Sequence, residues 1–482
     1  MKKGNLKTNI ILQSLYEVLN VCLPLITAPY VSRVLGVENL GIFSFALSTT
    51  VYFTRFAHLG TINHGTRSIA AVRHDKDKLN ETFWSIFWFK FITSSISVLI
   101  YILYCLLFCK DNKMVALLLT FEVLAAAFSI NWFFTGIEEI KVTVARNVIV
   151  RSLTIVSVFL FVKTREDLYK YVILMSLSTF VMSISLWTYI HKYIFIQKVS
   201  FSDIISHLKP SLMLFVPILA MTVYHTMDKT MLGILSNNTQ SGLYYNADKI
   251  INIPSGILSG VVMILLPRVT SLISQGKKDE ADDLFRKSFE LTVLVSIALS
   301  FGIASISNEF VPMYFGEEFS DSAILVMLLA PVLIAKAISF TARFQFLIPN
   351  HMENEFAMST IFGALVNFTI NILLIPKQGA LGAVIGTIGA EWGACLYQMY
   401  YVRKHIGLRQ TIINCLIYTA IGIIMFIAVR IVSTIKLKII YLLMLEVIAG
   451  ARIFILLSLV FWKITNSHIY EIMKLSIKKD RI

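Results

Sequence analysis

Long apolar runs separated by short polar loops occupy most of the sequence. The runs are about 20 residues or longer, the length at which a helix crosses a hydrocarbon core of roughly 30 Å. A segment inside a membrane must satisfy its own backbone hydrogen bonds, and runs of this length exceed the strands of a membrane barrel. The pattern therefore predicts an all-α polytopic membrane protein with about 14 transmembrane helices. We expect these spans near residues 10–35, 40–60, 82–108, 114–137, 143–163, 168–190, 210–236, 242–272, 286–308, 321–347, 356–376, 380–402, 410–432 and 439–462.

The composition excludes an ordinary soluble domain, because 56% of the 482 residues are hydrophobic and only 15% are charged. Basic residues are distributed unevenly among the predicted loops. About 26 of the 43 lie at the N-terminus or in loops on its side of the membrane, against about 9 on the other side. Since cytoplasmic loops are rich in Lys and Arg, this predicts that both termini are cytoplasmic. The net charge of +14 then reflects topology, and no nucleic-acid partner is expected.

The predicted spans fall into two groups of six. A basic amphipathic segment, 191–209, is long enough to lie along the cytoplasmic interface as a linker. It separates an N-terminal six-helix bundle, 1–190, from a C-terminal six-helix bundle, 210–405. Residues 406–482 add two further helices and a basic cytoplasmic tail.

A short sequence pattern recurs in the two groups. Leu35-Gly36 precedes Gly41-Ile42 in the first group, and Leu232-Gly233 precedes Gly242-Leu243 in the second. Both pairs lie at the predicted external turn between the first and second span of a group. An even number of spans gives the two copies the same orientation, so we expect parallel repeats about an axis along the membrane normal, around a central cavity.

The stretch from Pro210 to Pro267 carries charges in the middle of two apolar runs. Charged groups at that depth cost roughly 2.5–3.5 kcal/mol each, so they normally face a water-filled cavity or a protein partner. This arrangement predicts transport machinery. The polar and charged residues concerned are His225, Asp228, Lys229, Asp248 and Lys249.

Other spans carry polar stripes at helical spacing, which we expect to line the central cavity. In the first span the stripe includes Glu17. Further stripe residues are Arg55 and His58 in the second span, Lys90, Ser94 and Ser97 in the third, Lys336, Ser339 and Arg343 in the tenth, and Asn367 and Asn371 in the eleventh.

The alternative for each stripe residue is a polar contact between packed helices. We favour such contacts for Ser97 and Asn371, and cavity lining for Arg55, Lys229 and Lys249. Neighbouring residues lie about 100° apart on a helix, so in the pairs Asp228-Lys229 and Asp248-Lys249 one member can enter the cavity while the other pairs with a different helix.

The predicted spans contain more cations than acids. Arg430 and Arg452 are expected to extend to an interface and are discounted. The remaining excess suits an anionic substrate such as a phosphate or diphosphate. Neither a phosphate-binding loop nor His or Cys residues at metal-ligand spacing are present, so the sequence predicts a transporter without a cofactor or a metal site, not an enzyme.

The segment Asn131-Trp132-Phe133-Phe134-Thr135-Gly136-Ile137-Glu138 resembles a signature of bacterial polysaccharide repeat-unit transporters. These form the O-antigen flippase (Wzx-type) family of the multidrug/oligosaccharidyl-lipid/polysaccharide (MOP) exporter superfamily. The stretches from Asp228 to Gly233 and from Tyr244 to Ile250 are similar to the family's seventh and eighth helices, and Gly379 to Ala383 followed by Glu391 resembles its eleventh-to-twelfth helix region. Thr135 departs from the family pattern, which has Gln there.

The resemblance implies a flippase that moves undecaprenyl-diphosphate-linked oligosaccharide repeat units to the outer leaflet of a bacterial inner membrane by alternating access, for O-antigen, capsule or another surface polysaccharide. The partners it implies are the lipid-linked substrate, membrane lipids, a polysaccharide polymerase and a chain-length regulator.

The resemblance also implies site residues. Related lipid flippases hold the diphosphate with Arg on the first, second and eighth helices. Arg55 and Lys249 stand on matching helices here, and Lys90 or Lys229 replaces the cation that the first helix lacks. The residues considered for coupling or pairing are Glu17, Asp228, Asp248, His58 and His225, and the family signature comprises Asn131, Trp132, Gly136 and Glu138.

Two other functions fit the sequence less well. A cation-coupled multidrug antiporter of the same superfamily would need an acidic site, which the excess of cations disfavours. A polymerase or ligase of the same pathway would need a long external loop, and the predicted external loops are short.

Overall fold

The computed structural model describes residues 6–109 and 112–465, and side chains of that part from Leu23 onward except at Pro24, Ile140 and Leu408. Every secondary-structure element in these ranges is a helix. Within residues 6–109 and 112–465, thirteen helical stretches are long and apolar enough to cross a membrane, by length and composition. The prediction of an all-α polytopic membrane protein is therefore confirmed.

About 14 spans were predicted and thirteen stretches are found; the difference arises at α1, Leu6–His58. This helix contains both predicted spans 10–35 and 40–60, and it is broken at Gly36, whose φ of 76° lies in the left-handed region. Glycine adopts that conformation without a steric penalty, since it has no Cβ. The sequence thus correctly located the break between the two spans.

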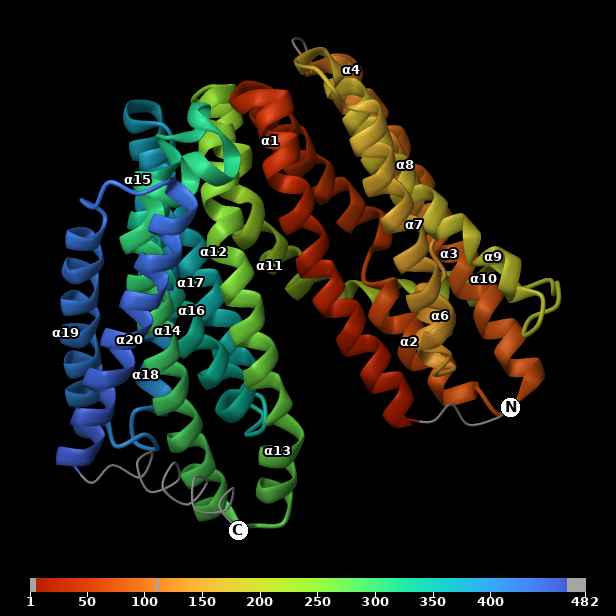
Figure 1. Cartoon of the computed structure of the whole chain (residues 1–482). Coiled ribbons are helices and arrows are strands. Elements are labelled where there is room, and N and C mark those ends of the chain that lie inside the picture. Colours follow the sequence, from red (N-terminus) through yellow and green to blue (C-terminus); the bar gives the residue numbers. More distant parts are fainter. Residues whose placement is uncertain (1–5, 110–111, 466–482) are drawn as a thin grey trace. The chain divides into compact units, whose positions relative to one another are not determined.

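The chain divides into two compact units, residues 1–245 and 246–482. The boundary falls inside helix α12, so the division by contacts differs from the predicted division at 191–209. The predicted repeat of two six-helix bundles stays a prediction. Figure 1 shows the helices of both units, coloured along the sequence from red to blue.

The first unit contains α1 to α11 and the start of α12. Its elements are α1 (Leu6–His58), α2 (Thr61–Val72), α3 (Lys76–Leu107), α4 (Lys113–Leu118), α5 (Thr120–Phe128), α6 (Asn131–Gly136), α7 (Ile140–Phe161), η1 (Arg165–Asp167), α8 (Leu168–Ser185), α9 (Trp187–Ile190), α10 (Phe201–Ser206), α11 (Leu208–Leu235) and α12 (Asn238–Ile264). Helix α1 is central to this unit, because it packs against α3, α5, α7 and α11.

Polar side chains join α1 to α3. Ser97 donates a hydrogen bond to the Phe53 carbonyl at 2.7 Å, and Ser94 donates to the Ala57 carbonyl at 2.9 Å. The Tyr101 and Thr50 hydroxyls lie 2.8 Å apart. These bonds confirm the interpretation of Ser97 as a contact between packed helices. The Ser94 side chain has the same role, so this part of the stripe does not line a cavity.

The predicted linker 191–209 is not a continuous helix. Helix α9 ends at Ile190, an irregular stretch follows, and α10 leads directly into α11. The stretch is held to α3, since the Phe195 backbone N–H donates to Asn80 Oδ1 and its carbonyl accepts from Trp84 Nε1, both at 2.8 Å. Ile196 is 89% exposed. Its location along a membrane interface stays a prediction.

The second unit contains the rest of α12 and the helices up to α20. These are α13 (Leu266–Ser274), α14 (Lys278–Phe315), η2 (Glu317–Phe319), α15 (Ser322–Leu329), α16 (Val332–Ala342), the π-helix η3 (Arg343–Leu347), α17 (Glu353–Gln378), α18 (Ala380–Val402), α19 (Leu408–Val432) and α20 (Ile439–Ile464). The two helices predicted in 406–482 are α19 and α20, which lie side by side and both pack against α14 (Figure 1).

The twelfth predicted span carries Gly382, Gly386, Gly389 and Gly393 on one helical face, which predicts a close-packing surface without chemistry. On α18 this face is indeed closely packed. A Cβ atom on Gly382 would meet the backbone of Leu374 and Ile375, and one on Gly386 would meet the Asn371 side chain. Gly389 faces Ile370 in the same way. The absence of side chains lets α17 and α18 approach closely along their length.

Candidate functional site

Two of the predicted substrate-binding cations come together in the first unit. Arg55 lies on α1 and Lys90 on α3, and both are close enough to His58 to act on it electrostatically. Within the described residues, Arg55 Nε and His58 Nδ1 are buried and have no hydrogen-bond partner. A polar atom left without a partner in a packed interior costs free energy, unless a ligand or water completes it. Arg55 and His58 are therefore suited to meet a ligand.

Lys90 has a more restricted environment than Arg55. Its side chain is 0% exposed, and its ammonium donates to the Ser129 carbonyl at 2.5 Å. Ser129 is the C-cap residue of α5. The last carbonyls of a helix lack partners within the helix and carry partial negative charge, so they stabilise a nearby cation. Lys90 thus caps α5 while placing positive charge beside Arg55 and His58.

A second group lies where α11 meets the start of α12. Asp228 is 6% exposed and accepts a hydrogen bond from the Tyr244 hydroxyl at 2.9 Å. Lys229, by contrast, is half-buried, and its ammonium lies 5.9 Å from the centroid of the Tyr245 ring. This agrees with the expectation that one member of the pair bonds to a different helix. His225 is exposed, with its ring 5.2 Å from that of Tyr224.

The remaining predicted residues are distributed between the units. Asp248 and Lys249 are half-buried on α12 and belong to the second unit. Glu17 lies on α1, but its side chain falls outside the described part of the structure. Arg55, His58 and Lys90 thus form one group, Asp228 and Lys229 a second, and Asp248 and Lys249 a third.

The second unit contains a charged cluster that sequence reasoning did not assemble. The Lys336 ammonium on α16 donates to Asn252 Oδ1 on α12 at 2.9 Å and lies 3.7 Å from Glu391 Oε1 on α18. Lys336 and Glu391 are each 8% exposed. The spacing of Lys336 along its span indicated a polar face, but no spacing links three helices that are far apart in the sequence.

Arg343 follows Lys336 on the same stripe and begins the π-helix η3. Its guanidinium lies 4.3 Å from the centroid of the Phe344 ring and 4.8 Å from that of Phe356. Aromatic faces attract such a cation most strongly where water is excluded. A π-helical turn frequently marks a functional position in a helix. Arg343 is therefore a further cation in the second unit, held by aromatic rings.

The family signature forms a packed junction. The Trp132 ring is 1% exposed and stacks on Phe83 with a centroid distance of 5.5 Å. A Cβ on Gly65 would collide with Trp132, and one on Gly136 would collide with Ile69. The signature therefore fixes α6 against α2 and α3.

Polar members of the signature make further contacts. Asn131 Oδ1 accepts from Arg146 at 3.1 Å, and Glu138 pairs with Arg73 at 2.5 Å. Glu138 has a φ of 64°, which is uncommon for a residue with a Cβ. The Thr135 hydroxyl, at the position that departs from the family pattern, is exposed and donates to the Asn131 carbonyl.

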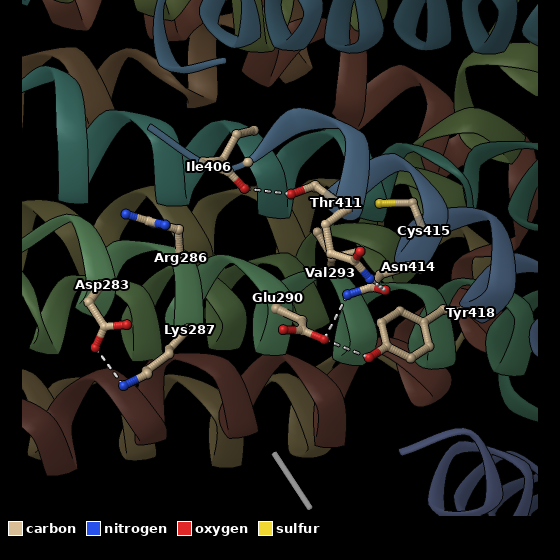
Figure 2. A pocket seen from close by; sticks show the side chains of 12 residues that line it. Asp283, Arg286, Lys287, Glu290, Val293, Ile406, Thr411, Asn414, Cys415 and Tyr418 are labelled. Carbon is tan, nitrogen blue, oxygen red and sulfur yellow. Dashed lines mark hydrogen bonds and ion pairs between the residues drawn. The ribbon is translucent and has the colours of Figure 1, made fainter. Parts of the chain in front are cut away.

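The second unit also contains a cavity of about 420 Å³ (Figure 2). It is formed by the N-terminal halves of α14 and α19 with Ile406 and Gly407, and its lining has as many acidic as basic side chains. Glu290 Oε1 accepts from Asn414 at 2.9 Å and from Tyr418 at 3.0 Å, while Lys287 pairs with Asp283. None of the predicted site residues whose side chains the structure describes lines it.

Comparison with known protein families shows to which family the chain belongs. The model of the polysaccharide biosynthesis protein family matches residues 6–273, which is more than half of the sequence. The chain belongs to this family. The model of the lipid II flippase MurJ matches the overlapping residues 154–451. The resemblance inferred from the signature and from helices seven and eight is therefore confirmed.

Similar curated proteins extend the match over most of the chain. A putative O-antigen transporter of Escherichia coli (strain K12) is 25% identical over 84% of this chain and 98% of its own length. A putative O-antigen transporter of Shigella dysenteriae is 22% identical over 83% of this chain and 100% of its own length. A probable low-salt glycan biosynthesis flippase, Agl15, of Haloferax volcanii is 24% identical over 34% of each chain. The relatives are transporters, in agreement with the prediction of a transporter in place of an enzyme.

Solved structures show the same fold. Lipid II flippase MurJ in an inward closed conformation matches with a TM-score of 0.73, 15% identity, and coverage of 95% of this chain and 100% of that chain. An inward-facing multidrug resistance transporter of the MATE family matches with a TM-score of 0.62, 14% identity, and coverage of 83% and 98%. The protein is thus a multi-pass membrane protein with the MOP-superfamily fold.

Proposed function

We propose that this protein is a flippase that carries undecaprenyl-diphosphate-linked oligosaccharide repeat units from the cytoplasmic to the outer leaflet. The observation that carries the proposal is the match of the polysaccharide biosynthesis family to residues 6–273, the part of the chain that contains Arg55, Lys90 and Lys249. The putative O-antigen transporters that the chain resembles over more than four fifths of its length support the same substrate class.

Arg55 is the principal contact for the diphosphate in this proposal. Its guanidinium presents a fork of donors that matches two phosphate oxygens, and its Nε is buried with no partner within the described residues. His58 Nδ1 is likewise buried and has no hydrogen-bond partner within the described residues. Both groups would donate a hydrogen bond to an anionic headgroup, so the bound state is favoured over the empty one.

Lys90 acts on the headgroup through its charge. Because its ammonium already donates to the Ser129 carbonyl, it strengthens the positive potential around Arg55 without a direct contact. Lys249 and Lys229 serve as the cations that receive the diphosphate at another stage of alternating access. Dividing the binding between two sets of cations keeps the diphosphate from being held so tightly at one site that it is not released.

The membrane potential supplies part of the driving force. Moving one negative charge outward across an inside-negative membrane is favoured by roughly 2.3 kcal/mol per 100 mV. Acids in the spans add coupling by binding and releasing a proton or sodium ion. The candidates are Glu17, Asp228 and Asp248, with His58 and His225 as pairing groups.

The cellular setting follows from the same proposal. The protein resides in the inner membrane of a bacterium, with both termini in the cytoplasm, as the distribution of basic residues predicts. The product would be O-antigen, capsule or another surface polysaccharide. A polysaccharide polymerase and a chain-length regulator are its expected partners on the outer side.

A deletion strain provides the test. Loss of the gene should abolish the surface polysaccharide and leave undecaprenyl-linked repeat units on the cytoplasmic side, and a plasmid copy should restore export. Resistance to cationic drugs should be unchanged, because the likeness to multidrug transporters concerns the fold alone. Normal surface polysaccharide with lowered drug resistance would establish the multidrug antiporter instead.

A further inference from the structure

Glu446 is a buried carboxyl on the inward face of α20. Residues at intervals of four along this helix, Leu442, Glu446, Gly450 and Phe454, are all buried, which places Glu446 in the middle of the packed stripe. Its side chain is 0% exposed, and both carboxyl oxygens lack a hydrogen-bond partner in the described structure. Such a group is uncommon, since buried carboxylates are normally paired.

The charged groups that act on Glu446 come from the two helices packed against α20. They are Glu309 on α14 and Arg430 on α19. Arg430 Nη1 donates to the two Glu309 oxygens at 3.0 and 2.9 Å and also to the Ser305 carbonyl at 3.2 Å. The charge of Arg430 is thus directed to Glu309, and Glu446 is left beside a pair that is already formed.

Ionisation of Glu446 in this position is disfavoured for two reasons. Burial removes the water that stabilises a carboxylate, and the neighbouring Glu309 charge repels a second negative charge. A buried group in this situation normally becomes neutral rather than remaining charged. The neutral form of a carboxyl group has a bound proton.

We propose that Glu446 is a proton-binding site that joins α20 to α14 and α19. In the arrangement observed, the carboxyl group holds a proton and α20 packs as an apolar helix. When the proton leaves to water, the carboxylate competes with Glu309 for Arg430, and the contact between α14 and α19 weakens. The site involves none of the residues assigned to the substrate, so it stands independently of the proposed function.

Infrared spectroscopy of the full-length protein in lipid at neutral pH tests the protonation directly. The wild-type spectrum minus that of Glu446→Gln should contain the carbonyl band of a protonated carboxylic acid. The exposed residue Glu353 on α17 provides the matched control, and Glu353→Gln should remove only a carboxylate band. A difference spectrum for Glu446 that contains carboxylate bands alone would overturn the proposal.

A second variant tests the competition for Arg430 and does not depend on the folding of Glu446→Gln. Glu309→Gln frees Arg430, so Glu446 should ionise and the protonated band should disappear from the spectrum of this variant. Persistence of the band in Glu309→Gln would refute the competition. A band already absent from the wild type would refute the bound proton as well.

Thermal unfolding gives the sign of the linkage. Because the folded state binds this proton more tightly than the unfolded chain, the wild-type midpoint should fall relative to that of Glu446→Gln as the pH rises from mildly acidic to mildly alkaline. Parallel midpoints across that range would contradict the assignment. Restoration of the wild-type midpoint at alkaline pH by sodium ions would also contradict it, because it would identify a metal cation as the ligand.

Discussion

Gly41 on α1 and Gly242 on α12 lie in backbone contact. A Cβ atom built on Gly41 would come within 3.0 Å of the Gly242 nitrogen and would overlap the Asn238 carbonyl. A Cβ built on Gly242 would overlap the Val37 carbonyl and come within 3.1 Å of the Gly41 nitrogen. The two glycines belong to the recurring pattern at the start of each predicted repeat, so the recurrence has a packing cause.

The first prediction concerns this contact. Gly242→Ala should destabilise the protein by about 1–3 kcal/mol, because the added methyl group overlaps backbone atoms that cannot rotate away. Gly256 on the same helix is the matched control, since nothing lies within 4 Å of its added Cβ. Gly256→Ala should be neutral or stabilising by up to about 1 kcal/mol. Thermal midpoints in detergent measure both, and equal midpoints for the two variants would contradict the close contact.

The second prediction separates the structural role of Lys90 from its electrostatic role. Lys90→Met keeps the length of the side chain and removes a buried charge, a change that is often neutral or stabilising when the replacement packs well. Membrane levels should therefore be at least those of the wild type, while substrate affinity falls about tenfold or more through the lost positive potential, equivalent to roughly 1.4 kcal/mol. Quantifying protein and surface polysaccharide in one strain checks this. Unchanged export would show that Lys90 only caps α5.

The third prediction distinguishes the members of the family signature. Trp132→Ala should cost about 3–5 kcal/mol, because a large buried ring is removed from the aromatic core. Glu138→Gln should cost at most about 1 kcal/mol, since the pair with Arg73 is substantially exposed. Thermal midpoints of the purified variants provide the comparison. A larger loss for Glu138→Gln than for Trp132→Ala would show that the signature is not chiefly a packing motif.

The fourth prediction concerns the bond between Tyr244 and Asp228. Tyr244→Phe removes a donor from a buried carboxyl group and should destabilise the protein by about 1.5–3 kcal/mol. Tyr400 is exposed, so Tyr400→Phe serves as the control and should change the thermal midpoint little. If both substitutions have the same small effect, the Asp228 carboxyl does not depend on this donor.

Much of the fold was predictable because the hydrophobic pattern is strong. The break at Gly36, the end of α11 near Ser236 and the glycine face of α18 were all located from residue types alone. Each of these features is local. Glycines or polar residues within a short stretch are enough to indicate a break, a helix end or a close-packing face. Within the helices, the spacing of Ser97 on α3 likewise revealed the polar face that bonds to α1.

Partners from distant helices could not be predicted. Lys90 donates to the backbone carbonyl of Ser129. Every residue has such a carbonyl, so residue types do not indicate which one accepts the bond. Arg430 was expected to extend to an interface, and it pairs with Glu309, a residue just past the end of the predicted span 286–308. In the sequence, Glu309 interrupts the apolar run and so marks the end of the predicted span. In the structure, Arg430 on α19 pairs with Glu309, and α14 continues to Phe315.

The most direct test of the central claim is export by variants in which Arg55 or Lys249 is neutralised. Arg55→Gln and Lys249→Gln, each produced at wild-type membrane levels in the deletion strain, should lose most of the surface polysaccharide. Arg452→Gln removes an exposed cation from α20 and should leave export intact. Full export by both Arg55→Gln and Lys249→Gln would contradict the diphosphate-binding role of these cations.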